Sequence, residues 1–381
     1  MYADATADAA MMERVRVAYT LEQCWHRVPG GTGVAALRIA EAMHEQSDIQ
    51  LLGVAGRHGH LPPDPWVPPM PVAYLPVAAP WLYETWLRAQ WPKVERATGH
   101  IDVAHATTLI PCATDAPLVV TLHDLAFLHD AAHFTAHGVR VFRRSVREIR
   151  RRADLVLCCS EATMDDCVAS GIGADRLRLV PLGVEPTRAT PADMARVRSL
   201  YRLPEQYLLF VGTVEPRKNL AGLFAAQRLL DQPLPLVVVG AEGWGDAADE
   251  ILNAVASDGV ADRRADVRFL GFVPHDDLPA VYACAEVFCY PSLREGFGLP
   301  ILEAMAQGVP VVTSQGGATE ETAGRAAVLV DPARPADIAA GIADARSRRA
   351  ELAGKGIARA HQLSWSNAAA LTAAAYREVA R

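Results

Sequence analysis

The sequence of 381 residues lacks the patterns by which membrane-spanning and secreted proteins are recognised. No window holds the roughly 18 consecutive apolar residues that a transmembrane helix needs. The N-terminus has no basic region followed by an apolar run, so it does not read as a signal peptide, and we expect a disordered leader there. These absences favour a cytoplasmic protein.

Paired cysteines and an excess of positive charge are also missing. The seven cysteines are odd in number and form neither a C-x-x-C pair nor a Cys/His cluster with zinc-ligand spacing. We therefore expect reduced, buried thiols and no metal site. The formal net charge is −7, which argues against a nucleic-acid partner. Apolar residues make up 51% of a chain whose length suits two globular domains.

Short apolar runs rich in β-branched residues alternate with helical patterns along the chain. Such runs are typical of parallel strands that are covered on both faces. The sequence therefore predicts an α/β fold built from two doubly wound, Rossmann-like units. The predicted strands are Val15–Thr20, Ile49–Ala55, Val72–Leu75, Ile101–His105, Leu118–His123, Leu155–Ser160, Leu177–Pro181, Tyr207–Gly212, Leu234–Gly240, Val267–Phe272, Val287–Tyr290, Val309–Thr313 and Ala327–Val330.

A proline-rich segment near Leu182–Leu203 marks the division between the two units. We expect one domain over residues 13–188 and a second over residues 189–365, with a final helix over residues 366–381 that packs back on the first. Ligands of open α/β sheets bind beyond the carboxyl ends of the strands. A site is therefore expected in the cleft between the two domains.

A turn after the strand that ends at Gly212 carries two cations, Arg217 and Lys218, directly before a helix for which Asn219 is the expected N-cap. Cations beside a helix N-terminus suit a diphosphate, because free N–H groups and the helix dipole add to their charge. Two solvated surface cations would give the same pattern.

The stretch E-G-F-G-L-P-I-L-E-A-M-A-Q-G, which starts at Glu295, places two carboxylates around a glycine-rich turn. We expect a loop up to Leu299 and a helix over Pro300–Gln307, with Glu303 in its first turn. There the helix dipole would keep Glu303 ionised, so that it accepts hydrogen bonds from hydroxyls and is a poor proton donor. A capping glutamate with packing glycines is the alternative.

The first half offers a glycine segment and two histidines at strand ends. Gly31–Ala36 matches the fingerprint G-x-G-x-x-A, but it does not follow its strand directly and no acid ends the second strand, so we reject a nicotinamide site. His123 and Asp124 end a buried strand, and His105 is a lesser candidate of the same kind. Either histidine could instead be a structural hydrogen-bonding group.

Three longer motifs resemble the retaining GT-B glycosyltransferases of family 4: V-G-T-V-E-P-R-K-N (Val211–Asn219), V-R-F-L-G-F-V-P (Val267–Pro274) and the segment Tyr290–Val312 with its E-x7-E signature. The resemblance implies two domains that face each other across a cleft, an N-terminal acceptor side and a C-terminal domain that binds the nucleotide sugar. It extends over nearly the whole chain and is most specific in the second half.

The resemblance also assigns roles to residues. Lys218 and Arg217 would contact the donor diphosphate, Glu303 the nucleotide ribose, and His123 the donor sugar or the oxygen that leaves it. Glu295 would lie at the sugar hydroxyls beside Gly296, Phe297, Gly298 and Leu299. Donor binding would be completed by Gly31, Gly33, Gly212 and Thr213. Many relatives carry Arg where this chain has Thr213, which leaves Arg217 as a substitute for that phosphate contact.

The implied reaction is the metal-independent, retaining transfer of a hexose to a sugar, lipid-linked or small-molecule hydroxyl, without a cofactor. The motifs favour GDP-mannose as the donor and a UDP-sugar next. A sugar-nucleotide epimerase, a phosphorylase and a non-catalytic nucleotide-sugar-binding subunit stay open as alternatives. The product would belong to glycan or polysaccharide biosynthesis.

The Arg140–Arg152 region combines arginines with apolar residues at helical spacing, among them Val139, Phe142, Val146 and Ile149. Such a helix can lie on anionic lipid at the inner face of a membrane. A solvated charged face is the alternative.

Overall fold

The computed structural model describes residues 14–131, 134–240 and 266–380. The predicted N-terminal leader and the last residue of the predicted final helix, Arg381, lie outside these ranges. All thirteen predicted strands are present, each within two residues of its predicted bounds. Within the described residues, no helix is both long and apolar enough to cross a membrane.

The first sheet has seven parallel strands in the order β3-β2-β1-β4-β5-β6-β7. Every residue of its central strands β4, β5 and β6 is buried, because helices cover both faces and the strands carry apolar side chains on both. The strands are β1 (Val15–Thr20), β2 (Ile49–Ala55), β3 (Val72–Tyr74), β4 (Val103–Ala106), β5 (Leu118–Leu122), β6 (Leu155–Cys158) and β7 (Leu177–Leu179).

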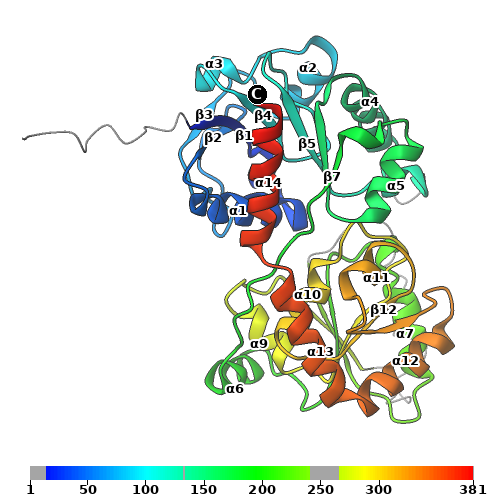
Figure 1. The fold of residues 1–381 in the computed structure, drawn as a ribbon. Coiled ribbons are helices and arrows are strands. Elements are labelled where there is room, and N and C mark those ends of the chain that lie inside the picture. Colours follow the sequence, from blue (N-terminus) through cyan, green and yellow to red (C-terminus); the bar gives the residue numbers. More distant parts are fainter. Residues whose placement is uncertain (1–13, 132–133, 241–265, 381) are drawn as a thin grey trace, which may run out of the picture.

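Helices of the first unit surround this sheet, and the last helix of the chain joins them (Figure 1). Helix α14 (Trp365–Val379), red in the figure, lies against α1 and also contacts β1 and β6. The other helices are α1 (Gly30–Ala42), α2 (Trp81–Ala89), α3 (Glu95–Thr98), α4 (Ala136–Arg152) and α5 (Glu161–Ala169).

The second sheet has six parallel strands in the order β10-β9-β8-β11-β12-β13. Its strands are β8 (Leu208–Val211), β9 (Leu236–Val239), β10 (Val267–Gly271), β11 (Val287–Tyr290), β12 (Val311–Ser314) and β13 (Val328–Val330). Its helices are α6 (Pro191–Leu200), α7 (Leu220–Arg228), α9 (Leu278–Ala283), α10 (Leu299–Ala306), α11 (Gly317–Ala323), α12 (Pro335–Ser347) and α13 (Arg349–Gln362).

The chain crosses between the two sheets twice, and the two crossings lie side by side. The Val184 amide donates to the Leu363 carbonyl oxygen at 3.0 Å. A Cβ at Gly183 would lie 2.2 Å from the carbonyl carbon of Ser364, so only glycine allows this approach. The division of the chain at residue 188 into two domains stays a prediction.

One local prediction in the second unit is wrong, and another is correct only in position. Helix α10 begins at Leu299, which places Glu303 in the second turn and not the first. Asn219 occupies the predicted N-cap position of α7, but its side chain does not cap the helix. It adopts a left-handed conformation, and its amide group donates to the carbonyl oxygens of Pro291 and Pro332 at 3.1 and 2.7 Å. Asn219 thus holds three loops together.

Candidate functional site

A cavity of about 520 Å³ lies where the carboxyl ends of the two sheets face each other. It brings together twelve of the thirteen predicted site residues. Gly33 is the exception, because it is packed against Pro29 and Trp66 and does not line the cavity. The twelve are Gly31, His123, Gly212, Thr213, Arg217, Lys218, Glu295, Gly296, Phe297, Gly298, Leu299 and Glu303.

Two helix N-termini face this cavity from opposite sides. Gly31 belongs to the first turn of α1, and Leu299 is the first residue of α10. A Cβ at Gly31 would lie 3.9 Å from Leu299 Cδ1, so the two helix ends approach each other at the cavity. Free N–H groups and the positive ends of both helix dipoles therefore favour an anion between them.

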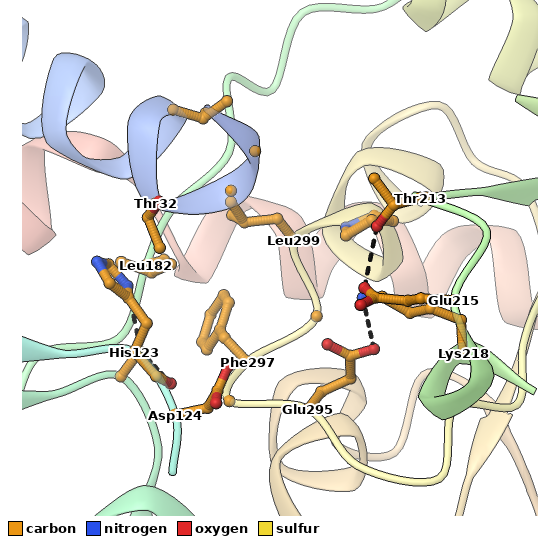
Figure 2. A pocket seen from close by; sticks show the side chains of 18 of the residues that line it. Thr32, His123, Asp124, Leu182, Thr213, Glu215, Lys218, Glu295, Phe297 and Leu299 are labelled. Carbon is orange, nitrogen blue, oxygen red and sulfur yellow. Dashed lines mark hydrogen bonds and ion pairs between the residues drawn. The ribbon is translucent and has the colours of Figure 1, made fainter. Parts of the chain in front are cut away.

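Glu295 forms ion pairs with both of the cations that were predicted to bind a diphosphate. Lys218 Nζ lies 2.7 Å from Glu295 Oε1, and Arg217 Nη1 lies 2.9 Å from Glu295 Oε2. Lys218 Nζ also donates to the Tyr290 hydroxyl at 2.6 Å, and Arg217 Nη2 is 3.0 Å from Glu215 Oε1. Figure 2 shows Lys218 and Glu295 on the same side of the cavity, opposite His123.

The pKa shifts of these residues follow from burial and pairing. Burial acts to raise the pKa of Glu295, but Lys218 and Arg217 outweigh it and bring the value to about 2. Burial lowers the pKa of Lys218, and the Glu295 charge offsets only part of that effect. For Arg217, burial acts to lower the pKa, but Glu295 and Asp124 reverse the direction and raise it. Glu295 and its two cations thus depend on one another for their charged states.

Thr213 does not supply the missing arginine contact. Its hydroxyl donates to Glu215 Oε1 at 2.9 Å, and the same oxygen is the partner of Arg217. Arg217 is therefore fixed between Glu215 and Glu295, and its buried Nε has no hydrogen-bond partner among the described residues. No sequence pattern pointed to this arrangement, because Glu215 follows the strand as an ordinary turn residue.

His123 lies at the end of β5, where Figure 2 places it at the cavity. Its Nε2 is 3.2 Å from the Thr107 carbonyl oxygen. Burial lowers the pKa of His123, although this hydrogen bond and Asp124 act in the opposite direction. The imidazole is therefore neutral at neutral pH and adds no positive charge to the cavity.

His105, the lesser candidate, is a structural residue. Its Nδ1 is 2.6 Å from the Tyr376 hydroxyl of α14, and its Nε2 is 2.8 Å from the Thr121 hydroxyl. Burial lowers its pKa to about 3. Both ring nitrogens of His105 thus form hydrogen bonds inside the core.

Glu303 is half-buried and lines both the first cavity and a second one of about 330 Å³. The Tyr282 hydroxyl donates to Glu303 Oε2 at 2.8 Å. Burial raises the pKa of Glu303, and its place in the second turn of α10 means that the predicted first-turn contact with the helix dipole is absent from the described structure. The second cavity is lined by residues that include Arg38, Glu185, His275, Asp276, Tyr282 and Gln307.

The glycine-rich loop before α10 also joins the two units. A Cβ at Gly296 would lie 1.7 Å from the carbonyl oxygen of His123, so the loop can touch the first unit only with glycine at this position. In the same region the Glu321 carboxylate of α11 accepts hydrogen bonds from the amides of Glu161 and Ala162 at 2.7 and 2.8 Å. Glu321 thereby satisfies the free N–H groups at the start of α5.

Metal-ligating side chains do not gather in this part of the molecule. Among the described residues, no group of three or more His, Cys, Asp or Glu is arranged to hold a metal ion. Positive charge at the cavity comes from side chains and helix ends.

The chain matches two family models that together span most of its length. Residues 29–188 match the model described as Glycosyltransferase Family 4, and residues 195–361 match the model described as Glycosyl transferases group 1.

Named relatives agree with these models. The chain is 36% identical over 271 residues to the O-antigen chain mannosyltransferase B of Escherichia coli, which covers 68% of this chain and 70% of that protein. It is 33% identical over 315 residues to the D-inositol 3-phosphate glycosyltransferase of Geodermatophilus obscurus, which covers 76% of this chain and 69% of that protein.

Solved structures show the same fold at low sequence identity. The Anabaena protein Alr3699/HepE in complex with UDP and glucose has a TM-score of 0.75 at 20% identity, over 96% of this chain and 100% of that one. Sucrose-phosphate synthase from Thermosynechococcus elongatus has a TM-score of 0.76 at 21% identity, over 96% and 99%. The two facing Rossmann-like sheets are those of the GT-B fold, and the chain belongs to glycosyltransferase family 4 and is a glycosyltransferase.

Proposed function

We propose that this protein transfers a hexose from a nucleoside-diphosphate sugar to a hydroxyl acceptor, with retention of the anomeric configuration and without a metal ion. The observation that carries the proposal is the convergence of Lys218, Arg217 and the N-termini of α1 and α10 on one cavity, which a second cavity adjoins at Glu303. The proposal assigns the anionic diphosphate to the first cavity and the nucleoside to the second.

The proposed donor spans both cavities. Its diphosphate lies against Lys218, Arg217 and the two helix ends, and its sugar lies between His123 and the loop Glu295–Leu299. Glu303 accepts hydrogen bonds from the ribose, and the base enters the second cavity. Mannose, carried by GDP, is the first candidate sugar because a mannosyltransferase is among the relatives. UDP-glucose is the next, because a protein of this fold has been solved with it.

In the proposed step, the bond between the anomeric carbon and the diphosphate oxygen breaks while the acceptor hydroxyl bonds to that carbon on the same face. The electron pair stays on the departing phosphate oxygen, which also receives the hydroxyl proton. Lys218, Arg217 and the helix N-termini stabilise the charge that grows on the phosphate. Neutral His123 would hold a sugar hydroxyl or the leaving oxygen. Proton NMR of the new anomeric signal tests retention, and a trapped glycosyl-enzyme adduct would contradict the direct step.

A binding screen followed by an assay tests the function. Thermal unfolding is recorded without metal ions in the presence of UDP, GDP, ADP or dTDP, since a ligand at 100 times its Kd adds about 2.7 kcal/mol of stability. The sugar nucleotides of the base that binds are then incubated with and without sugar acceptors. Transfer needs an acceptor, whereas an epimerase releases free sugar without one. If no nucleotide raises the unfolding temperature, the proposal fails.

The raised pKa of Glu303 predicts that nucleotide affinity falls as the pH is lowered, and does so at a higher pH than an ordinary glutamate would cause. Protonation removes an acceptor for the ribose, and the protonated fraction grows as pH drops. Glu303→Gln should bind the nucleotide about tenfold more weakly at neutral pH. Because the phosphates also titrate, titration calorimetry should compare the pH profiles of both proteins. Parallel profiles would contradict this role.

Gly296→Ala should lower the transfer rate by about 10²-fold, because the domains could no longer meet at His123. A displacement of about 1 Å at reacting groups has effects of this size. Small-angle scattering should show a larger radius of gyration for the variant. Gly354→Ala is the matched control, since a Cβ there meets no atom within 4 Å. An alanine variant with normal turnover would show that this contact is dispensable.

We further propose that the protein works in the cytoplasm and contacts anionic membrane through α4. The seven cysteines are free and buried, which suits a reducing compartment. Val139, Val146 and Ile149 of α4 pack into the core, so only its arginine face is available, and the contact would be electrostatic rather than inserted. Co-sedimentation with vesicles of phosphatidylglycerol, compared with phosphatidylcholine, tests it. A lipid-linked acceptor would fit such a contact.

A further inference from the structure

The charges that line the first cavity do not favour a diphosphate as strongly as the motifs suggest. Among its described lining residues, three side chains are basic and four are acidic. Lys218 and Arg217 are each paired with Glu295, and Arg217 also with Glu215. The lining residues concerned are Arg27, Arg217 and Lys218, and Asp124, Glu215, Glu295 and Glu303. Binding of a dianionic diphosphate therefore needs positive charge beyond the paired cations.

Arg27 is the basic lining residue that has no carboxylate partner within the described part of the chain. It lies on the first unit, in the loop between the short 3-10 helix η1 (Glu22–Trp25) and α1, and its side chain is exposed. Val28, Pro29 and Gly30, which follow it, also line the cavity. Arg27 thus stands beside the N-terminus of α1, across the cleft from the paired cations.

The loop that carries Arg27 is held just before it. Trp25 Nε1 donates to the His60 carbonyl oxygen at 2.9 Å, and His26 Nε2 lies 3.0 Å from the Tyr83 hydroxyl. Arg38, the basic residue of the second cavity, already pairs with Glu41 at 2.8 Å. Arg27 therefore follows two residues whose side chains anchor the loop, and it differs from Arg217, Lys218 and Arg38 because its guanidinium has no carboxylate partner among the described residues.

We propose that Arg27 binds the donor diphosphate from the first domain, opposite Lys218 and Arg217, so that the diphosphate is held between the two domains. This inference rests on the proposed function. An arginine fork can donate two hydrogen bonds to phosphate oxygens, which a lysine cannot match in geometry. The same contact would favour closure of the cleft when the donor is bound, because the phosphate then attracts both sides.

Titration calorimetry tests this inference with the nucleoside diphosphate that gives the largest stabilisation in the screen, in buffer without metal ions, and with its nucleoside as the second probe. Arg27→Ala should weaken diphosphate binding by about 10- to 100-fold and leave nucleoside binding unchanged. Arg27→Lys should recover part of the affinity. Arg57→Ala, which removes another exposed arginine of the first unit that lines neither cavity, is the matched control and should bind as the unmodified protein does.

A parallel measurement on Lys218→Ala distinguishes a failure of the Arg27 contact from a failure of the proposed donor site. If Lys218→Ala weakens diphosphate binding and Arg27→Ala does not, the role of Arg27 is overturned and the proposed site stands. If neither variant changes diphosphate binding, the site itself is wrong. Loss of nucleoside binding in Arg27→Ala to the same degree as diphosphate binding would also overturn the inference, since the effect would then not depend on phosphate.

Discussion

Replacing Lys218 with methionine is expected to lower the turnover number of sugar transfer by about 10²–10³-fold, with a smaller effect on nucleotide affinity. The Lys218 ammonium is buried at the cavity and already donates to Glu295 and Tyr290. In the proposed reaction its remaining proton meets the leaving phosphate oxygen, whose charge is greatest in the transition state. The contact therefore strengthens as the glycosidic bond breaks, and its loss lowers turnover more than binding.

Steady-state kinetics with the donor identified by the nucleotide screen measures this effect. Methionine keeps most of the apolar volume of the lysine chain, and Glu295 retains Arg217 as a partner, so the variant should still fold. Lys355→Met is the control, because Lys355 pairs with Glu351 at 2.6 Å on the exposed surface of α13. A turnover number within a few-fold of the unmodified protein would remove Lys218 from the mechanism.

Glu295→Gln is expected to lower the free energy of unfolding by about 3–5 kcal/mol in addition to reducing activity. The substitution leaves Lys218 and Arg217 buried without their shared anion. Since the pKa of Glu295 is about 2 in the folded protein and 4.5 for an ordinary glutamate, as in the unfolded chain, its contribution is complete above pH 4.5 and is lost as the pH falls towards 2. The free energy of unfolding of Glu295→Gln should therefore lack the part of the pH dependence that the Glu295 carboxylate causes between pH 4.5 and 2.

Glu351 offers a matched control for burial. It also lies between one arginine and one lysine, Arg348 at 3.1 Å and Lys355 at 2.6 Å, but its pairs are exposed. Glu351→Gln should therefore leave urea unfolding nearly unchanged. The double variant Glu295→Gln/Lys218→Met should recover part of the stability lost in the single one, which a double-mutant cycle measures. Equal unfolding curves for Glu295→Gln and the unmodified protein would contradict the buried pairing.

Glu295 and Lys218 show what could not be predicted from the sequence. The motif predicted that Glu295 and Lys218 lie at the same site, and the cavity contains both. It did not predict that they neutralise each other, because a sequence gives no distance between side chains that are 77 residues apart. Arg27 was missed for a related reason. A single arginine three residues before Gly30 carries no motif, and its lack of a partner is visible only in three dimensions.

The fold was largely predictable. Apolar, β-branched runs must be covered on both faces, and alternating helices supply that cover. The predictions that needed correction concern the ends of helices, where tertiary contacts determine the backbone conformation. Asn219 adopts a left-handed conformation because its amide reaches Pro291 and Pro332, neither of which is near it in sequence. Gly33, which matches the fingerprint as well as Gly31 does, turns to Pro29 and Trp66 on the next face of α1.

The two histidines at strand ends also show which features the sequence determines and which only the tertiary structure determines. The sequence alone determined that His105 and His123 lie at the carboxyl ends of buried strands, and it determined the parallel sheets and the E-x7-E loop, because these depend on local periodicity and turn chemistry. Only the tertiary structure decided between the two histidines. Helix α14, at the far end of the chain, covers His105 and fixes it with Tyr376, whereas His123 lines the cavity. That choice depends on where a distant helix packs.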